Sequence, residues 1–286
     1  MRLDYGRHAP WVIASLLVVG CPDDDPPTGE GNGSSSTGTM ESSTGGSSVM
    51  MADSTTGELE GGGSSSEGSS STGLPTEVTL RGNIQDYFPP AQPIPDAAIS
   101  VLGQPGLMTV SDENGDFEMM SLATGTFDRF VVADSDQFWG AVVPFTTEYE
   151  DIDEFELSQV SLQVIDIQIG VLQEQDPTVM VEPDTAVLLV AIEQNTATGA
   201  VVELDPPPDD TTFYAPDANG QPILGANVAQ WSAYPVVVFF NLPPGPEGEY
   251  EITVTHPERE CTPDDAEPPT FGRHVNLIRV DCPPPN

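Results

Sequence analysis

The chain has 286 residues, enough for one or two domains, and a formal net charge of −39 from 46 acidic against 7 basic residues. All basic residues are arginine, so lysine chemistry such as a Schiff base or an isopeptide crosslink is excluded. Nucleic-acid affinity comes from basic side chains that displace counterions, and we therefore expect no nucleic-acid partner. The 29 prolines and 27 glycines favour turns and linkers over long helices.

Residues 1–20 are predicted to be a signal peptide. Arg2 and Arg7 precede an apolar run over residues 9–20, which is too short for a membrane span but fits a signal-peptide core. The junction Val18-Val19-Gly20-Cys21 resembles the bacterial lipobox, although leucine is more usual at the position of Val18. That resemblance implies diacylation of Cys21 and a lipid-anchored location in the bacterial cell envelope, with the outer membrane as the expected site. The alternative is an ordinary secretory signal with an incidental cysteine.

Residues 21–75 are predicted to form a disordered tether. Of the 47 residues over 27–73, 33 are Ser, Thr or Gly, and the few apolar residues show no period. Such a segment buries too little apolar surface to offset the entropy of ordering. A flexible coil of this length typically spans roughly 35 to 40 Å, so the tether would hold the folded part clear of lipid headgroups.

Residues 76–151 are predicted to form a first β-sandwich domain, because short β-branched and aromatic runs alternate with turn residues. The turn Asp112-Glu113-Asn114-Gly115 lies between two apolar runs and predicts a β-hairpin, since Asn and Gly tolerate positive φ. Strands are expected over residues 78–84, 98–102, 108–110, 117–119, 127–133 and 138–143.

Residues 152–182 are predicted to connect two domains. The acidic run over residues 148–156 is interpreted as a solvated link. Apolar residues over 158–172 recur at helical spacing and favour a helix that is buried against the first sandwich. Positions 165, 167, 169 and 171 also alternate as in a strand, so a strand remains the alternative.

Residues 183–286 are predicted to form a second β-sandwich domain. The strands expected at 186–192, 199–204, 236–242 and 250–255 follow an order that suggests a diverged repeat of the first domain. If the turn at Asn219 matches the turn at Asn114, the second copy carries an insertion over residues 221–234, which contains Trp231. Cys261 and Cys282 are predicted to form a disulfide, because they are an even pair in an exported chain.

Two phrases resemble the carboxypeptidase regulatory-like (transthyretin-like) β-sandwich family: residues 241–245 (NLPPG) followed by 250–254, and residues 111–117 (SDENGDF). The resemblance covers residues 76–282 as two copies. It implies two tandem antiparallel Greek-key sandwiches of seven strands that act as accessory modules in extracellular proteins. Related collagen-adhesin domains crosslink themselves through a lysine, which this chain lacks.

Candidate catalytic residues are sparse. His256 and Glu258 have the spacing of a one-face pair on a strand, and His274 is the other histidine of the mature chain. An open zinc site needs a second nitrogen ligand near this pair, and none is close in sequence. No strand-to-helix elbow motif marks a nucleophilic serine. We expect no enzyme activity, no cofactor and no metal site, and we interpret the histidines as surface residues.

Calcium is the ion for which the sequence offers candidate ligands. Asp112, Asn114 and Asp116 have the alternate spacing of the start of a calcium loop, but the later ligands of such a loop are out of register. These residues equally fit a hairpin turn. The acids over residues 148–156 also make diffuse, weak calcium binding plausible.

Aromatic side chains are the candidates for glycan binding, because exposed rings stack on sugars. They are Trp139, Trp231, Tyr234, Tyr87 and Phe88. Each has a competing interpretation as a core or strand-edge residue. Exposed, coplanar rings would favour the glycan interpretation.

The sequence thus predicts a mainly β protein, lipid-anchored at the cell envelope or surface, with non-catalytic binding or structural modules. A carbohydrate-binding module protein is the alternative, and a calcium-stabilised adhesion protein is the third interpretation. The expected partners are the membrane, through the lipid, and an envelope protein or a glycan.

Overall fold

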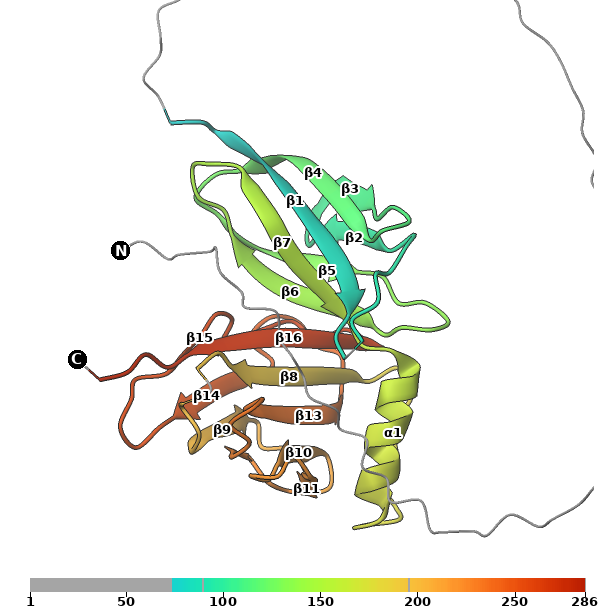
Figure 1. Ribbon diagram of the computed structural model, residues 1–286, viewed down its shortest axis with the longest axis vertical. Coiled ribbons are helices and arrows are strands. Elements are labelled where there is room, and N and C mark those ends of the chain that lie inside the picture. Colours follow the sequence, from blue (N-terminus) through green and yellow to red (C-terminus); the bar gives the residue numbers. More distant parts are fainter. Residues whose placement is uncertain (1–73, 89, 195, 286) are drawn as a thin grey trace, which may run out of the picture. The chain divides into compact units, whose positions relative to one another are not determined.

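The computed structural model describes residues 74–88, 90–194 and 196–285, which fall within one compact unit (Figure 1). The predicted signal peptide, Cys21 and nearly all of the predicted tether lie outside the described residues. Strands dominate, and the described residues contain one helix, α1 (Leu162–Gln173), so the prediction of a mainly β fold is confirmed. No helix in this part of the chain is long and apolar enough to cross a membrane.

The N-terminal half, residues 77–159, is a two-layer sandwich. Its strands are β1 (Glu77–Asp86), β2 (Ala98–Val101), β3 (Gln104–Val110), β4 (Asp116–Ala123), β5 (Phe127–Val132), β6 (Gly140–Thr146) and β7 (Ile152–Gln159). In one layer β1 pairs antiparallel with β4 and parallel with β7. In the other layer β2 lies between β3 and β5, and β5 pairs with β6. The layers enclose an apolar core in which the rings of Phe130 and Phe145 stack at 4.1 Å.

The C-terminal half, residues 186–281, repeats this pairing. Its strands are β8 (Ala186–Ile192), β9 (Ala200–Asp205), β10 (Phe213–Pro216), β11 (Pro222–Leu224), β12 (Val228–Ala229), β13 (Val236–Leu242), β14 (Glu251–Thr255), β15 (Thr262–Pro263) and β16 (His274–Asp281). Here β8 pairs antiparallel with β13 and parallel with β16, as β1 does with β4 and β7. Strand β9 lies between β12 and β14, as β2 does between β3 and β5. The shared pairing supports the predicted internal repeat.

An irregularity in strand pairing marks the same place in both halves. Ser121 in β4 has φ 61° and Asn241 in β13 has φ 59°, which is the left-handed region that L-residues seldom adopt. Both residues lie where the register with the partner strand shifts, as in a β-bulge. Each is followed by a buried leucine, Leu122 or Leu242. The sequence comparison of residues 121–125 with 241–245 therefore matches equivalent backbone positions.

The expected match between the turns at Asn114 and Asn219 is wrong. The turn at Asn114 joins β3 to β4, which lie in different sheets, so it does not close the hairpin that the sequence predicts. The turn at Asn219 does close a hairpin, between β10 and β11. This hairpin has no counterpart in the strand pairing of the N-terminal half, so the added segment begins near Phe213, before the predicted insertion at residue 221.

Two expectations for the connecting segment are also corrected. The acidic run was expected to be a solvated link, but from Ile152 onward it forms β7, whose alternate side chains Phe155 and Leu157 are buried. The helix is present, and the alternative strand is excluded. It packs against the sheet face of β8 and β13 of the C-terminal half, beside Tyr87, Phe88 and Trp139 of the N-terminal half, and it does not join the core of the first sandwich. It is also less buried than expected, with Leu172 as its fully buried residue.

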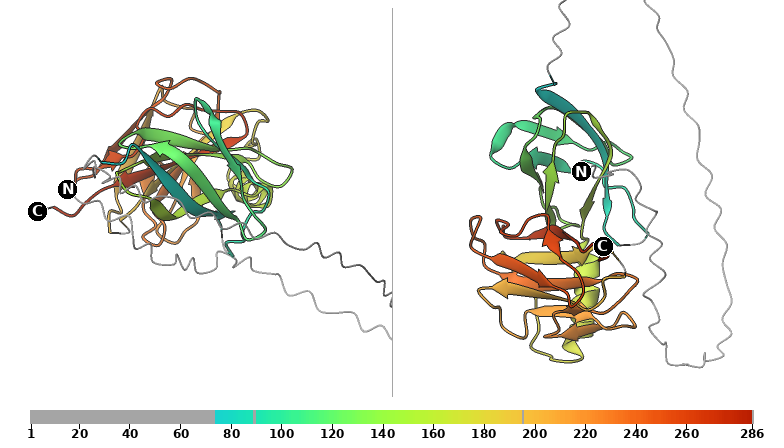
Figure 2. Two further views of the ribbon diagram at one scale, coloured as in Figure 1. Left: turned by 90° about the horizontal axis from the view of Figure 1, so that it is seen from above. Right: turned by 90° about the vertical axis from the view of Figure 1, so that its left-hand side faces the viewer.

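The two halves share one sheet. Strand β16 pairs with β8 on one side and, in parallel, with β6 of the N-terminal half on the other (Figure 1; Figure 2 shows two further views). This produces the strand order β11-β10-β13-β8-β16-β6-β5-β2-β3. Because hydrogen bonds cross between the halves, the division into two tandem domains stays a prediction.

Candidate functional site

An apolar sheet face is the foundation of the candidate site. Strands β8 and β13 are buried along nearly their whole length, as expected for continuous apolar runs that are covered on both faces. One face packs against β9 and β14 in the main core of the C-terminal half. The other face presents Val187 and Leu189 from β8 and Val236, Val238 and Phe240 from β13 to a separate cluster.

Helix α1 covers this second face. Its residues Leu162, Ile165, Ile169 and Leu172 recur at spacings of three and four, so they lie on one side of the helix and pack towards the sheet. The opposite side faces solvent, and Ile167 there is 47% exposed. The helix therefore covers the sheet face with one apolar side and leaves its opposite side exposed to solvent.

Aromatic side chains from three distant segments gather beside the helix. Tyr87 and Phe88 follow β1, and their rings meet edge to face at 5.1 Å. Tyr234 precedes β13, and its ring lies 5.8 Å from that of Tyr87 and 6.4 Å from that of Trp231. Trp139 is buried in the same cluster. The structure thus brings together all five aromatic residues that the sequence marked as candidates.

A cavity of about 90 Å³ lies between α1, the sheet face and these rings. Aliphatic residues of α1, β8 and β13 form its floor and roof, and Phe88, Tyr214, Trp231 and Tyr234 contribute to its wall. Burial raises the pKa of Tyr214 well above its usual range, so its hydroxyl stays protonated. None of the described residues that line the cavity is Asp, Glu, Arg or His.

The extra hairpin β10–β11 is held against the end of α1 by one amide side chain. The Nε2 of Gln175 donates to the carbonyl oxygen of Pro222 at 2.7 Å, and its Oε1 accepts from the backbone N–H of Leu224 at 3.0 Å. At the hairpin turn, Gly220 has φ 86°, and a side chain there would meet the Trp231 ring at 3.0 Å. Glycine thus allows Trp231 to pack on the turn.

The same turn is stabilised by a carboxylate. The Oδ1 of Asp217 accepts from the backbone N–H groups of Asn219 at 2.8 Å and Gln221 at 3.0 Å. These bonds lower the pKa of Asp217 from its ordinary value, and the bond from Gln221 has the largest effect. The hairpin wall of the cavity is therefore locally ordered.

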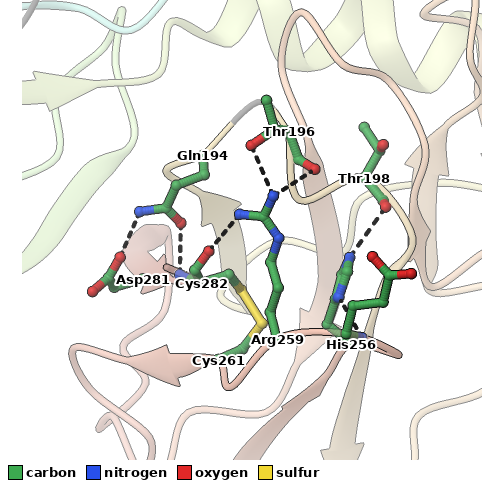
Figure 3. Close-up of a disulfide and its surroundings, with 9 residues drawn as sticks. Gln194, Thr196, Thr198, His256, Arg259, Cys261, Asp281 and Cys282 are labelled. Atoms are coloured by element: carbon green, nitrogen blue, oxygen red, sulfur yellow. Dashed lines mark hydrogen bonds between the residues drawn. A yellow bond between two sulfur atoms is a disulfide. The ribbon is translucent and has the colours of Figure 1, made fainter. Parts of the chain in front are cut away.

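The expected disulfide between Cys261 and Cys282 is present, and its surroundings are bonded to the loop that follows β8 (Figure 3). Arg259 donates to the carbonyl oxygen of Cys282 at 2.9 Å and to Oγ1 of Thr196 at 3.1 Å. The Oε1 of Gln194 accepts from the backbone N–H of Cys282 at 2.6 Å. This cluster ties the end of β16 to the loop that follows β8.

The histidines that the sequence singled out make separate backbone contacts. The Nε2 of His256 lies 3.3 Å from the carbonyl oxygen of Thr198 (Figure 3), and its Nδ1 accepts from the backbone N–H of Glu258 at 3.1 Å. His274 on β16 bonds instead to the carbonyl oxygen of Gly272. Across residues 74–88, 90–194 and 196–285, no three His, Cys, Asp or Glu side chains form a group that could hold a metal ion.

The residues of the candidate calcium loop are engaged in the turn between β3 and β4. Oδ1 of Asp112 accepts from the backbone N–H groups of Asn114 and Asp116 at 2.8 and 3.0 Å. Oδ1 of Asp116 accepts from the side chain of Asn83 at 2.9 Å. These contacts match the competing interpretation of these residues as a turn.

The geometry of the aromatic cluster does not meet the criterion for a glycan platform. The planes of Tyr87 and Phe88 lie at 79°, and those of Trp231 and Tyr234 at 84°. Trp139 is only 4% exposed. These rings line and close an apolar cluster, and they do not present coplanar faces to solvent.

Several cavity residues escaped the sequence analysis, among them Tyr214 and Phe240. The sequence did contain an indication of this site. The unbroken apolar runs of β8 and β13 imply that both faces of these strands are covered, whereas the core of the sandwich covers only one face. The missing cover is the helix, which was expected to pack on the other half.

No protein-family model and no curated protein sequence matches the chain. Among solved structures, the Bacillus anthracis TIE protein is 12% identical over 72% of this chain and 34% of its own length, with a TM-score of 0.24. The shaft pilin SpaA of Lactobacillus rhamnosus GG is 8% identical over 74% of this chain and 100% of its own, with a TM-score of 0.23. GBS52, the minor pilin of Streptococcus agalactiae, is 9% identical over 73% and 98%, with a TM-score of 0.20. The chain spans about a third of the length of the first of these, and at such TM-scores the likenesses carry no argument about function.

Proposed function

We propose that the chain is a lipid-anchored protein of the bacterial cell envelope or surface whose β-rich part is a non-catalytic structural and binding module. The lipobox-like junction at Cys21 supports the anchor, and the Ser/Thr/Gly-rich composition of residues 21–75 supports a tether that gives the module reach. In this proposal the lipid determines location, and the folded part presents its loops and cavity to a partner.

The observation that carries the structural role is the continuity of the sheet through both halves. Strand β16 is hydrogen-bonded to β6 and β8, so the halves are held by backbone bonds and not only by a linker. An ionic contact reinforces this joint: Arg129 on β5 bonds to Asp265 at 2.5 and 3.0 Å and to Glu247 at 3.2 Å. A joint of this kind restricts the relative motion of the halves more than a flexible linker would.

We also propose that both halves are sandwiches of the carboxypeptidase regulatory-like type. Their common strand pairing and the left-handed residues at Ser121 and Asn241 support this assignment. Such modules usually serve as accessory parts of extracellular proteins, in agreement with the proposed location. No observation on the described residues favours glycan or calcium binding over this role.

Fractionation of a bacterium that expresses the full chain tests the anchor. The wild-type protein is expected in the membrane fraction, whereas Cys21→Ser is expected in the soluble fraction, because it lacks the acylated thiol. Val18→Leu introduces the residue that is more usual at this lipobox position. It is the matched control and should remain in the membrane fraction. Membrane association of Cys21→Ser equal to that of the wild type would contradict the proposal.

A further inference from the structure

We propose that the cavity under α1 is a binding site for a small, uncharged, hydrocarbon-like ligand, about the size of a short alkyl chain. This goes beyond the proposed envelope role, because neither the anchor nor the continuous sheet requires such a site. The cavity has a volume of about 90 Å³. A dry protein cavity of about 150 Å³ binds benzene, so a volume of this order favours a smaller apolar group.

The lining favours hydrocarbon over water. A buried water needs two to four polar partners, and a cavity lined by aliphatic and aromatic side chains stays dry. Apart from Gln168 and the hydroxyl groups of Tyr214 and Tyr234, the described side chains that line the space are apolar. Val164, Ile165 and Ile169 of α1 line it together with Leu189 and Val238 of the sheet. A hydrocarbon that enters removes apolar surface from water without displacing a hydrogen-bonded solvent molecule, which gives a favourable free energy of binding.

The charge of the surroundings defines the ligand further. A charged group buried in this cavity would meet no counter-charge, because none of the described residues that line it is Asp, Glu, Arg or His, and the desolvation cost would be large. An anionic amphiphile would in addition approach a chain with a net charge of −39. Neutral hydrocarbons carry neither cost.

The way in which the walls are built separates this site from a chance gap in a core. The repeated strand pairing supplies β8 and β13, but α1 and the hairpin β10–β11 have no counterpart in the N-terminal half. Helix α1 covers the sheet face, whereas the hairpin extends the same sheet at its edge beyond β13. Gln175 ties the two additions together through Pro222 and Leu224. The elements added to the repeat therefore supply two of the walls of the cavity.

Xenon and a pair of matched alcohol and amine ligands test the proposal on the full chain with Cys21→Ser, which removes the bound lipid as a competing hydrocarbon. Methyl NMR spectra under xenon are expected to show saturable shifts at Val164, Ile165 and Val238. 1-Butanol is expected to displace xenon, whereas butylammonium, of similar size but charged, is expected to be at least tenfold weaker.

Two variants on the same helix locate the binding. Val164→Phe fills the cavity and is expected to weaken xenon binding at least tenfold, whereas Gly170→Leu adds bulk where no neighbouring atom lies within 4 Å and is expected to leave it unchanged. If Val164→Phe does not fold, Val238→Ile, which adds one methylene inside the cavity, replaces it with a smaller expected loss. The absence of saturable shifts, equal binding of butylammonium and butanol, or unchanged binding in the filled variant would each overturn the proposal. Because these measurements use the Cys21→Ser variant, which lacks the proposed anchor, a negative result would not count against the proposed envelope role.

Discussion

Arg129 makes the buried ionic contact between the two halves. Its side chain is 9% exposed and that of its partner Asp265 is 4% exposed, whereas Glu247 at the edge of the contact is 61% exposed. Asp265 is paired with Arg129 through both carboxylate oxygens. Breaking such a buried pair from one side leaves a charge without compensation, which costs far more than the pair contributes when intact.

We therefore expect Arg129→Met to lower the free energy of unfolding by about 3–5 kcal/mol in urea denaturation. Arg81→Met is the matched control, because Arg81 pairs with Glu118 and Asp153 on the surface, where water screens the charges. The control should change stability little. Equal losses in the two variants would show that the buried contact has no special weight.

Asp217 gives the hairpin wall a pH dependence. Its pKa is lowered in the folded state, so its carboxylate stabilises the fold above the unfolded pKa of about 3.9, and this stabilisation is lost as the pH falls through the folded value. Asp217→Ala should lower the melting temperature at pH 7, and the difference from the wild type should shrink below about pH 4. Asp217→Asn, which still accepts the backbone bonds, should lose less. A difference that does not change with pH would contradict this assignment.

At the scale of elements, the equivalent irregularities in β4 and β13 are predicted to respond oppositely to glycine. Ser121→Gly relieves a left-handed conformation and should raise the free energy of unfolding by about 1 kcal/mol. Asn241→Gly relieves the same conformation but removes two side-chain bonds, to the backbone N–H of Glu182 at 2.8 Å and the carbonyl oxygen of Met180 at 2.7 Å. It should therefore be destabilising, since each bond contributes about 0.5–1.5 kcal/mol. Urea denaturation of both variants measures these changes, and a stabilising effect of Asn241→Gly would contradict the stabilising role assigned to the two side-chain bonds.

Elements with a strong local pattern were predictable from the sequence, and those defined by distant contacts were not. The bounds of β8 and β13 match the expected strands because their apolar runs are long and end at polar residues or proline. By contrast, β7 carries acids on its exposed face, so its alternation was hidden by charge. The periodicity of α1 indicated a helix, but no local signal states which sheet a helix covers.

The candidate site shows the same limit. The sequence marked each aromatic residue, such as Tyr87 and Tyr234, as a candidate by itself. It did not show that they lie close together, because this depends on how β8 and β13 pair and pack in the folded chain. The turn at Asn219 resembles that at Asn114 in sequence, and only the pairing of β10 with β13 shows that it belongs to an added hairpin. Local turn chemistry determines a turn, whereas the strands that the turn joins are determined by the whole sheet.

At the scale of the whole molecule, the disulfide fixes the end of the chain against the sheet. It closes a loop of 20 intervening residues between Cys261 and Cys282, and the second of these cysteines is fully buried. On the chain-entropy account, replacing both cysteines by serine should lower the free energy of unfolding by about 3 kcal/mol. Urea denaturation of the oxidised wild type and the double variant measures this, and an unchanged midpoint would mean that the bond does not constrain the unfolded chain.

The acidity of the whole chain disfavours its binding to anionic surfaces. With 46 acids against 7 arginines, it is repelled by anionic lipid surfaces, and a lipid anchor would be needed to hold it at a membrane. In the proposal the anchor and the acidic module are therefore connected: the negative charge opposes binding to an anionic bilayer, and the acyl chains on Cys21 overcome that repulsion.

The most direct test of this account is the mass of the N-terminal peptide of the mature protein, purified from bacterial membranes. The account predicts that the chain begins at Cys21 and that this residue carries a diacylglyceryl group. The same peptide from Cys21→Ser should be unmodified. A mature chain that begins at another residue, or an unmodified Cys21 at the N-terminus, would contradict the proposed anchor.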